Sequence, residues 1–352
     1  MPDPVRADNL GSFLRPDYLL EARAANLPAD ELRAVEDRAV EEVIAFQEGL
    51  GLPVVTDGEF RRRFFFSTIE VLVEGIDPLG FVRHHRNEKG EEQELRTPTP
   101  VARLKRISTL AEYEASFVRE RTDRLVKVTL PSPSLLSVYW KEGVSHGYES
   151  REDYLDHLVE LMNEDVRSLK EAGVDHVQID APHYAYIQKV MDVDDRNAKL
   201  RELVEIDNRV FAGVDGITTA LHVCRGNDRS HFTGTESYDG FAAAIFPYTA
   251  AQRLLLEYDD ERSGGFTPLQ HVREDQEVVL GLVTTKRDDM ESEDELKQRI
   301  DEAAQYVPME RLALSTQCGF GSNAEGNAIS RDAQKAKMEL VVRTATDVWG
   351  HA

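Results

Sequence analysis

The chain has 352 residues, of which 41% are hydrophobic and 30% are charged, a balance typical of a globular protein with a sizeable core. Its formal net charge of −23 would repel phosphate backbones and anionic lipids, which argues against nucleic-acid and membrane partners. No apolar run approaches the roughly 20 residues that span a bilayer. The first residues lack the basic and apolar regions of a secretory signal, so we expect a cytoplasmic protein.

Short apolar runs alternate with helical segments along the chain, which is the pattern of repeated strand–helix units. In chain order, the predicted strands end at 11–13 and run through 54–59, 125–131, 174–182, 217–225, 253–259, 278–285 and 311–319. Helical patterns are clearest over 28–49, 150–173 and 292–306. Eight strands that alternate with helices predict a (β/α)8 TIM barrel, formed by a single domain over residues 1–352.

One polar stretch interrupts this pattern. It covers about 83–124, between the second and third predicted strands, and is most polar over 83–99. We interpret 83–99 as a protruding hairpin or loop. It either covers the mouth of the barrel or stands in solvent as an insertion.

Polar residues gather where the predicted strands end, which is the end at which barrel enzymes build their active sites. A single residue of this kind means little, but these come from six different strands and would converge on one small mouth. They are Ser12, Glu59, Asp180, His222, Cys224, Glu257 and Cys318.

Four of these residues carry groups that bind zinc. His222 and Cys224 are two residues apart on one strand, so both side chains point into the barrel. Cys318 follows another strand and delivers a second thiol to the same rim. Imidazole and thiolate ligands suit a borderline-soft metal such as zinc. The simpler interpretation of the two cysteines is a pair of buried, inert thiols.

Glu257 adds a carboxylate directly after three leucines at the end of a strand. A carboxylate at that place is costly unless it is paired or bound to a metal. A salt bridge to Arg225 or Arg262 would satisfy it. Bound instead beside two thiolates and an imidazole, it would complete a tetrahedral zinc site.

The order of these pieces resembles the catalytic barrel of cobalamin-independent methionine synthases, across most of the chain. The matching pieces are Gly-Ser-Phe at 11–13, Asp-Gly-Glu at 57–59, Gln-Ile-Asp at 178–180, His-Val-Cys at 222–224, Glu257 and Cys-Gly at 318–319. The resemblance implies zinc bound by His222, Cys224, Glu257 and Cys318. It also implies that Ser12, Glu59 and Asp180 hold the amino-acid part of homocysteine, which the zinc activates as a thiolate for methyl transfer to give methionine.

The local chemistry suits these roles. Glu59 and Asp180 are acceptors for an ammonium group, and Ser12 can donate to a carboxylate. Glu257, the harder oxygen ligand, is expected to give way when the substrate sulfur binds. Asp180 and Lys286 are the candidate catalytic residues. Lys286, an acid or an anion anchor, follows the seventh strand, where the family has a histidine proposed as proton donor to the leaving folate.

Other residues near the mouth carry weaker predictions. The arginines at 61–63 either bind an anionic co-substrate or lie on the surface, and His183 and Tyr184 lie near the rim. The chain has room for one barrel, whereas relatives that use methyl-folate have a second, N-terminal barrel. The methyl donor is therefore expected to be a folate or a methylated corrinoid protein.

The same residues allow two alternative functions. The same zinc chemistry could alkylate another thiol, as in the transferases that join epoxides to coenzyme M. A sulfonate thiol would need cations where this chain has Glu59 and Asp180, which favours homocysteine. The second alternative is a non-catalytic barrel that binds a thiol or zinc.

Overall fold

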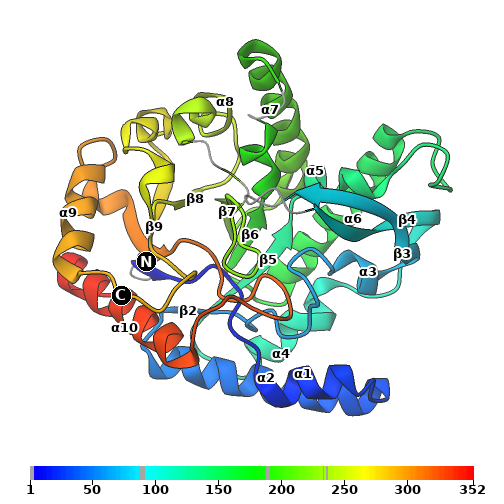
Figure 1. Ribbon diagram of the computed structural model, residues 1–352, viewed down its shortest axis with the longest axis horizontal. Helices are drawn as coiled ribbons and strands as arrows, with labels where there is room; N and C mark the ends of the chain where they lie inside the picture. Colours follow the sequence, from blue (N-terminus) through cyan, green and yellow to red (C-terminus); the bar gives the residue numbers. More distant parts are fainter. Residues whose placement is uncertain (1–3, 87–91, 188–190, 233, 235–236) are drawn as a thin grey trace.

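Eight parallel strands lie side by side in one sheet, in the order β1-β10-β9-β8-β7-β6-β5-β2. The structure is a computed structural model that describes residues 4–86, 92–187, 191–232, 234 and 237–352. Helices surround the sheet on its outside (Figure 1). The strands are β1 (Ala7–Asp8), β2 (Val54–Val55), β5 (Leu125–Pro131), β6 (His176–Asp180), β7 (Thr218–Val223), β8 (Arg253–Glu257), β9 (Glu277–Val283) and β10 (Leu312–Thr316). One strand comes from each predicted run, and the predicted (β/α)8 barrel is confirmed.

The two edges of this sheet, β1 and β2, approach each other through contacts beyond the short strands. The Asn9 side chain donates to the carbonyl of Val54 at 3.1 Å. The Thr56 hydroxyl donates to the carbonyl of Gly11 at 2.7 Å. These bonds satisfy polar groups that a strand edge would otherwise expose, so the sheet is nearly closed.

Long helices cover the strands, and their ends follow from the sequence. Ser150, Ser292 and Ser330 each accept a hydrogen bond from the amide three residues later, which caps α6, α9 and α10. The helices are α1 (Asp17–Ala24), α2 (Ala29–Gly49), α3 (Ile69–Leu72), α4 (Ser116–Arg119), α5 (Pro133–Leu136), α6 (Arg151–Glu171), α7 (Val193–Asn208), α8 (Ala242–Ile245), α9 (Glu293–Ala303) and α10 (Arg331–Trp349). Across the described ranges, none of them is long and apolar enough to cross a membrane.

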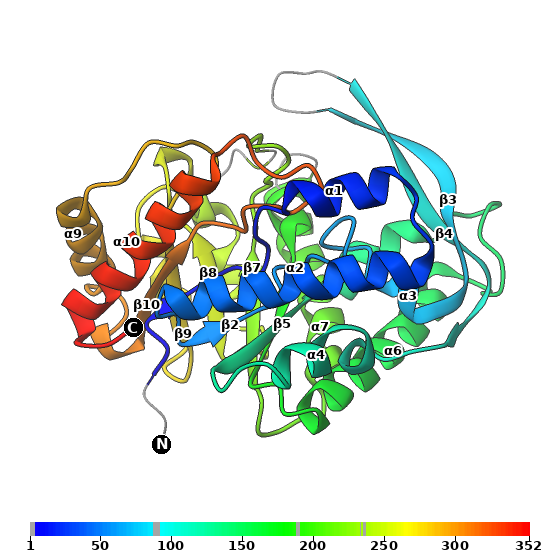
Figure 2. The same ribbon diagram turned by 90° about the horizontal axis from the view of Figure 1, so that it is seen from below.

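An antiparallel hairpin of β3 (Val73–Arg86) and β4 (Glu92–Arg106) projects from one side of the barrel (Figure 2). The polar segment 83–99 lies on this hairpin, which begins ten residues before it. Residues 87–91, between the two strands, lie outside the described part of the chain. The rest of the polar stretch carries α4 and leads into β5.

The interior of the barrel is layered. Its middle is a small apolar cluster contributed by four neighbouring strands, β7 to β10, and by the segment that follows β1: Leu10, Ala220, Leu255, Val279 and Ala313. Towards the amino ends of the strands lies a buried ionic layer. There the Lys127 ammonium donates to Asp8 at 2.6 Å, and Arg253 lies 3.4 Å from the other oxygen of Asp8. The ionic layer and the acidic strand ends thus lie at opposite ends of the barrel, while the neutral amide of Gln178 reaches the middle and donates to the Leu10 carbonyl at 3.4 Å.

The ionic layer makes one stability prediction. Lys127→Met would leave the Asp8 carboxylate buried with Arg253 as its remaining cation, and we expect a loss of about 3 kcal/mol in the free energy of unfolding. Denaturant unfolding monitored by circular dichroism would measure it. Lys297→Met removes two ion pairs at the surface, with Glu293 and Asp347, and should cost less than about 1 kcal/mol. Equal losses in the two variants would contradict the prediction.

Candidate metal centre

The four predicted ligands meet at the carboxyl ends of three strands. His222 lies on β7 and Cys224 directly follows it, Glu257 is the last residue of β8, and Cys318 lies two residues beyond β10. All four are buried, and one ligand atom from each lies within 4.8 Å of all the others. Parallel strands in register bring residues that are far apart in sequence to the same end of the barrel.

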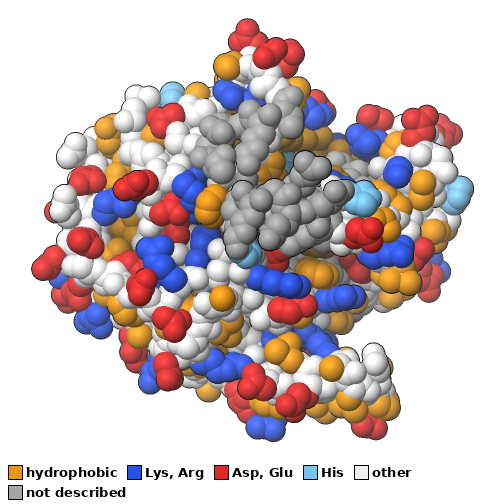
Figure 3. All heavy atoms as spheres, in the orientation of Figure 1, with side chains coloured by type: hydrophobic (Ala, Val, Ile, Leu, Met, Phe, Trp, Pro, Cys, Tyr) orange, Lys and Arg blue, Asp and Glu red, His pale blue; other side chains and the backbone are white. Residues whose placement is uncertain are grey.

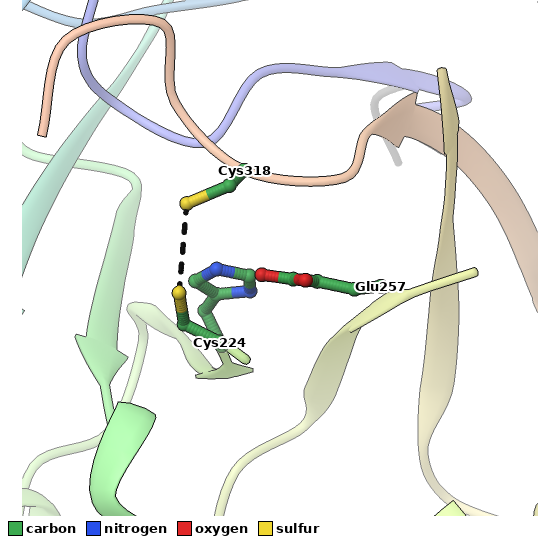
Figure 4. A group of neighbouring side chains, drawn as sticks. Cys224, Glu257 and Cys318 are labelled. Carbon is green, nitrogen blue, oxygen red and sulfur yellow. Dashed lines mark hydrogen bonds between the residues drawn. The ribbon is translucent and has the colours of Figure 1, made fainter. Parts of the chain in front are cut away.

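The two sulfurs are spaced for a shared metal. Cys224 Sγ and Cys318 Sγ are 3.7 Å apart and face each other, with the Glu257 carboxylate pointing towards them (Figure 4). A disulfide would need about 2.05 Å. Two thiolates at about 2.3 Å from one tetrahedral zinc would be about 3.8 Å apart. The observed spacing fits the metal and not the disulfide.

His222 presents a free nitrogen to the same point. Its Nδ1 lies 3.0 Å from the carbonyl of Leu255, and since a carbonyl can only accept, Nδ1 carries the proton. Nε2 is then the nitrogen left for a metal, and it is buried without a partner in hydrogen-bonding geometry among the described residues. Such a backbone bond to the second nitrogen is how proteins orient a metal-binding imidazole. In the metal-free protein, burial disfavours the charged imidazole, but interaction with Cys318 outweighs this effect and raises the pKa of His222 to about 9, so the imidazole carries a proton that a bound zinc ion would replace.

One of the two carboxylate oxygens of Glu257 accepts a hydrogen bond. Its Oε1 accepts a hydrogen bond from the Arg225 amide at 3.0 Å, while Oε2 is buried without such a bond within the described part of the chain. Arg262 pairs with Asp260 at 2.7 Å and not with Glu257. Burial raises the pKa of Glu257, and the nearby Lys286 ammonium opposes that rise. The free oxygen is a ready ligand for a cation.

The two thiols share a proton in the metal-free protein. The Cys224 S–H bond donates to Cys318, which holds the pKa of Cys318 well below its usual range. The same hydrogen bond, together with burial, raises the pKa of Cys224. A bound zinc ion would take the place of that proton, because coordination deprotonates a thiol outright.

Polar side chains from two other loops hold the turn that carries Cys318. The Gly319 carbonyl accepts from the Asn227 amide at 2.7 Å and from the Thr285 hydroxyl at 3.1 Å. Behind Glu257, the Tyr238 hydroxyl accepts from the Glu257 amide at 2.8 Å. Asn227 and Tyr238 lie outside the predicted strands, and Thr285 ends one of them, but no sequence pattern shows that their side chains reach the ligand turns.

Ser12 is brought beside the same turn. A Cβ on Gly319 would lie 2.0 Å from Ser12 Oγ, so only glycine permits this approach. Ser12 Oγ accepts from the Gly321 amide at 3.3 Å, which leaves its own hydrogen available for a ligand. The serine predicted to bind a carboxylate therefore lies next to the Cys318 turn.

Glu59 and Asp180 form a buried acidic pair near the ligands. Glu59 Oε1 accepts from Thr129 at 2.8 Å, and Oε2 has no hydrogen-bond partner in the described structure. Asp180 accepts from Gln178 at 2.8 Å. Burial raises the pKa of Asp180 to about 7, and the negative charge of Glu59 adds to this rise. Since the charge of Glu59 disfavours that of Asp180, a cation bound beside the pair would stabilise the ionised form of Asp180.

Lys286 follows β9 and is paired with a residue that the sequence analysis did not single out. Its Nζ lies 3.5 Å from Asp259 Oδ2, and the two side chains are 10% and 1% exposed. Asp259 is two residues beyond Glu257. The same spacing rule that linked His222 to Cys224 could have suggested it.

The arginines at 61–63 divide between structural and exposed positions. Arg62 is buried and bonded to Glu114 at 2.6 Å, and the buried Arg61 pairs with Asp37 at 2.5 Å. Arg63 is exposed, over the ring of Phe64.

Acidic and basic side chains are interspersed on the face shown in Figure 3, so the acidic excess is not gathered in one patch there.

His183 and Tyr184 belong to a buried network beyond β6. The Tyr184 hydroxyl donates to Asp207 on α7 at 2.6 Å, and His183 Nε2 lies 2.8 Å from the Ser134 hydroxyl. Burial lowers the pKa of His183 to about 3, so the ring is neutral. This network fastens α7 to the ends of β5 and β6.

The fold and the site together define a barrel of parallel strands with a buried imidazole, two thiols and a carboxylate at its mouth. The chain matches the family described as "Cobalamin-independent synthase, Catalytic domain" over residues 14–339. It belongs to that family, and the resemblance drawn from the sequence is confirmed.

Known proteins agree with this assignment. The Bacillus subtilis (strain 168) protein YxjH, whose name marks it as uncharacterized, is 32% identical, with 98% of this chain and 95% of YxjH covered. A methionine synthase of Thermococcus kodakarensis is 25% identical over 88% of this chain and 85% of its own. The structure titled as a B12-independent methionine synthase from Shewanella sp. W3-18-1 in complex with selenomethionine has a TM-score of 0.78 at 21% identity, covering 98% of both chains. That structure supports the fold.

Proposed function

We propose that the protein is a zinc-dependent S-methyltransferase that methylates homocysteine to give methionine. The observation that carries the proposal is the buried set of four donors, with ligand atoms within 4.8 Å of one another. His222, Cys224, Glu257 and Cys318 would hold the ion, and the buried His222 Nε2 and Glu257 Oε2 atoms, both without a hydrogen bond in the described structure, fit that role. Bound zinc would lower the pKa of a substrate thiol and so supply a nucleophile at neutral pH.

The remaining residues would hold homocysteine. Glu59 and Asp180 would accept hydrogen bonds from its ammonium group, which relieves the repulsion between the two buried carboxylates. Ser12 would donate its hydroxyl hydrogen to the substrate carboxylate. Burial of this site excludes water and aligns the sulfur with the methyl donor, and alignment supplies much of such a rate.

The transfer is a displacement at carbon. The substrate sulfur forms a bond to the methyl carbon as the bond from that carbon to the donor breaks, and the donor leaves with the electron pair. Lys286 would stand at the mouth as an acid or as an anchor for an anionic donor. The donor is a methyl-folate or a methylated corrinoid protein. The acidic pair disfavours the sulfonate of coenzyme M as the thiol substrate.

Metal analysis and turnover test this proposal together. We expect about one zinc per chain by mass spectrometry in protein purified without chelator, and methionine formation from homocysteine with one of the two donor classes. Protein without tightly bound metal would refute the zinc chemistry. Full zinc occupancy with no turnover on any donor would leave a non-catalytic thiol-binding or zinc-binding barrel.

A further inference from the structure

Lys286 is a buried cation whose hydrogen-bonding capacity is unused. Its ammonium lies 3.5 Å from Asp259, beyond a good hydrogen-bond distance, and Nζ has no hydrogen-bond partner among the residues described. A buried ammonium normally satisfies its three donors. Lys286 therefore lies near the Asp259 carboxylate without forming a hydrogen bond to it.

A second carboxylate lies within its electrostatic reach. Glu257 is two residues before Asp259, and its Oε2 also lacks a hydrogen bond within the described part of the chain. After burial itself, Lys286 has the largest effect on the pKa of Glu257, which it lowers. Its charge also lowers the pKa of Cys318. The Lys286 ammonium therefore interacts both with the ligand cluster and with Asp259, a carboxylate outside that cluster.

If Glu257 were displaced from the metal, its carboxylate would require a nearby cation, and Lys286 is such a cation. If the substrate sulfur took the place of Glu257 among the ligands, the freed carboxylate would start from a fully buried position. A buried carboxylate without a cation is strongly unfavourable. The two neighbouring arginines have other partners. The Arg225 guanidinium donates to the Ser263 hydroxyl and to the Arg262 carbonyl. Arg262 pairs with Asp260 at 2.7 Å and lies 4.0 Å from Asp259. Lys286 is the cation positioned to receive it.

We propose that Lys286 is a positioning residue that exchanges carboxylates, pairing with Asp259 while Glu257 is a ligand and with Glu257 once the substrate sulfur has replaced it. Asp259 competes for the ammonium and so sets how readily Glu257 gives way. This inference rests on the proposed function. It adds that thiol affinity is tuned by a pair of residues, Lys286 and Asp259, that bind neither the metal nor the amino-acid part of the substrate.

Thiol binding without a methyl donor tests the exchange. The metal-loaded protein, with zinc or with cobalt as a coloured substitute, would be titrated with homocysteine by calorimetry and by absorbance. Lys286→Met should weaken thiol binding by about tenfold or more, because the displaced carboxylate loses its cation. Lys286→Arg should restore most of the affinity. Asp259→Asn should tighten binding by about threefold, because Lys286 no longer has a competing partner.

Opposite signs in the two variants separate this role from a structural one. Loss of fold would weaken binding in both, whereas the exchange predicts weaker binding for Lys286→Met and tighter binding for Asp259→Asn. Lys297→Met, at the surface, is the matched control and should bind as wild type. Wild-type affinity in Lys286→Met, or shifts of the same sign, would overturn the exchange alone. Failure of the wild type to take up metal would overturn the proposed function and the exchange together.

Discussion

Replacing Cys318 with serine is expected to reduce bound zinc to a small fraction of one ion per chain and to lower methyl transfer at least about a hundredfold. Cys318 supplies one of two soft ligands, and its sulfur lies 3.7 Å from that of Cys224. A serine hydroxyl is harder, shorter and protonated at neutral pH, so it replaces neither the charge nor the reach of the thiolate. Metal content after dialysis and steady-state turnover would both be measured.

Ser322→Ala is the matched control for this substitution. Ser322 lies 3.9 Å from the Cys318 sulfur in the same turn but offers no ligand to the cluster. It should keep about one zinc per chain and most of the activity. A Cys318→Ser protein that retained stoichiometric zinc after dialysis would show that the metal, if bound, lies elsewhere.

The fold could be predicted from the sequence because each barrel strand is a short apolar run between helical segments. The closure of the barrel could not, since β1 and β2 are short and meet through Asn9, Thr56 and nearby backbone groups. The buried ionic layer could not be predicted from the sequence either. Lys127 and Arg253 stand within or beside apolar runs, and nothing local shows that both lie at Asp8.

The site could be predicted where strand geometry determines it. The two-residue spacing of His222 and Cys224, and the strand ends at Glu257 and Cys318, place four donors at one mouth. What supports them could not be predicted, because Asn227, Thr285 and Tyr238 act through hydrogen bonds to backbone groups that are distant in the sequence. The sequence placed Lys286 at the mouth but did not reveal Asp259, which decides where its ammonium lies.

Asp180→Asn is expected to raise the KM for homocysteine by about a hundredfold, because it removes a buried charged acceptor for the substrate ammonium. The matched probe is 4-mercaptobutyrate, which has the same thiol and carboxylate but no amino group. Its binding should change little in the variant, so the preference of the protein for homocysteine over this analogue should largely disappear. Inhibition constants for the analogue and KM values for homocysteine would give the ratio.

Glu59→Gln should act in the same direction, since Glu59 carries the second carboxylate of the acidic pair. In the free protein, burial raises the pKa values of both groups, and the charge of Glu59 adds to the rise at Asp180. A bound ammonium group would favour the charged form of both carboxylates. An equal loss of affinity for homocysteine and 4-mercaptobutyrate in Asp180→Asn would place Asp180 in a different role. Its register partner on β7 is His222, so an equal loss would mean that Asp180 supports the imidazole and not the substrate.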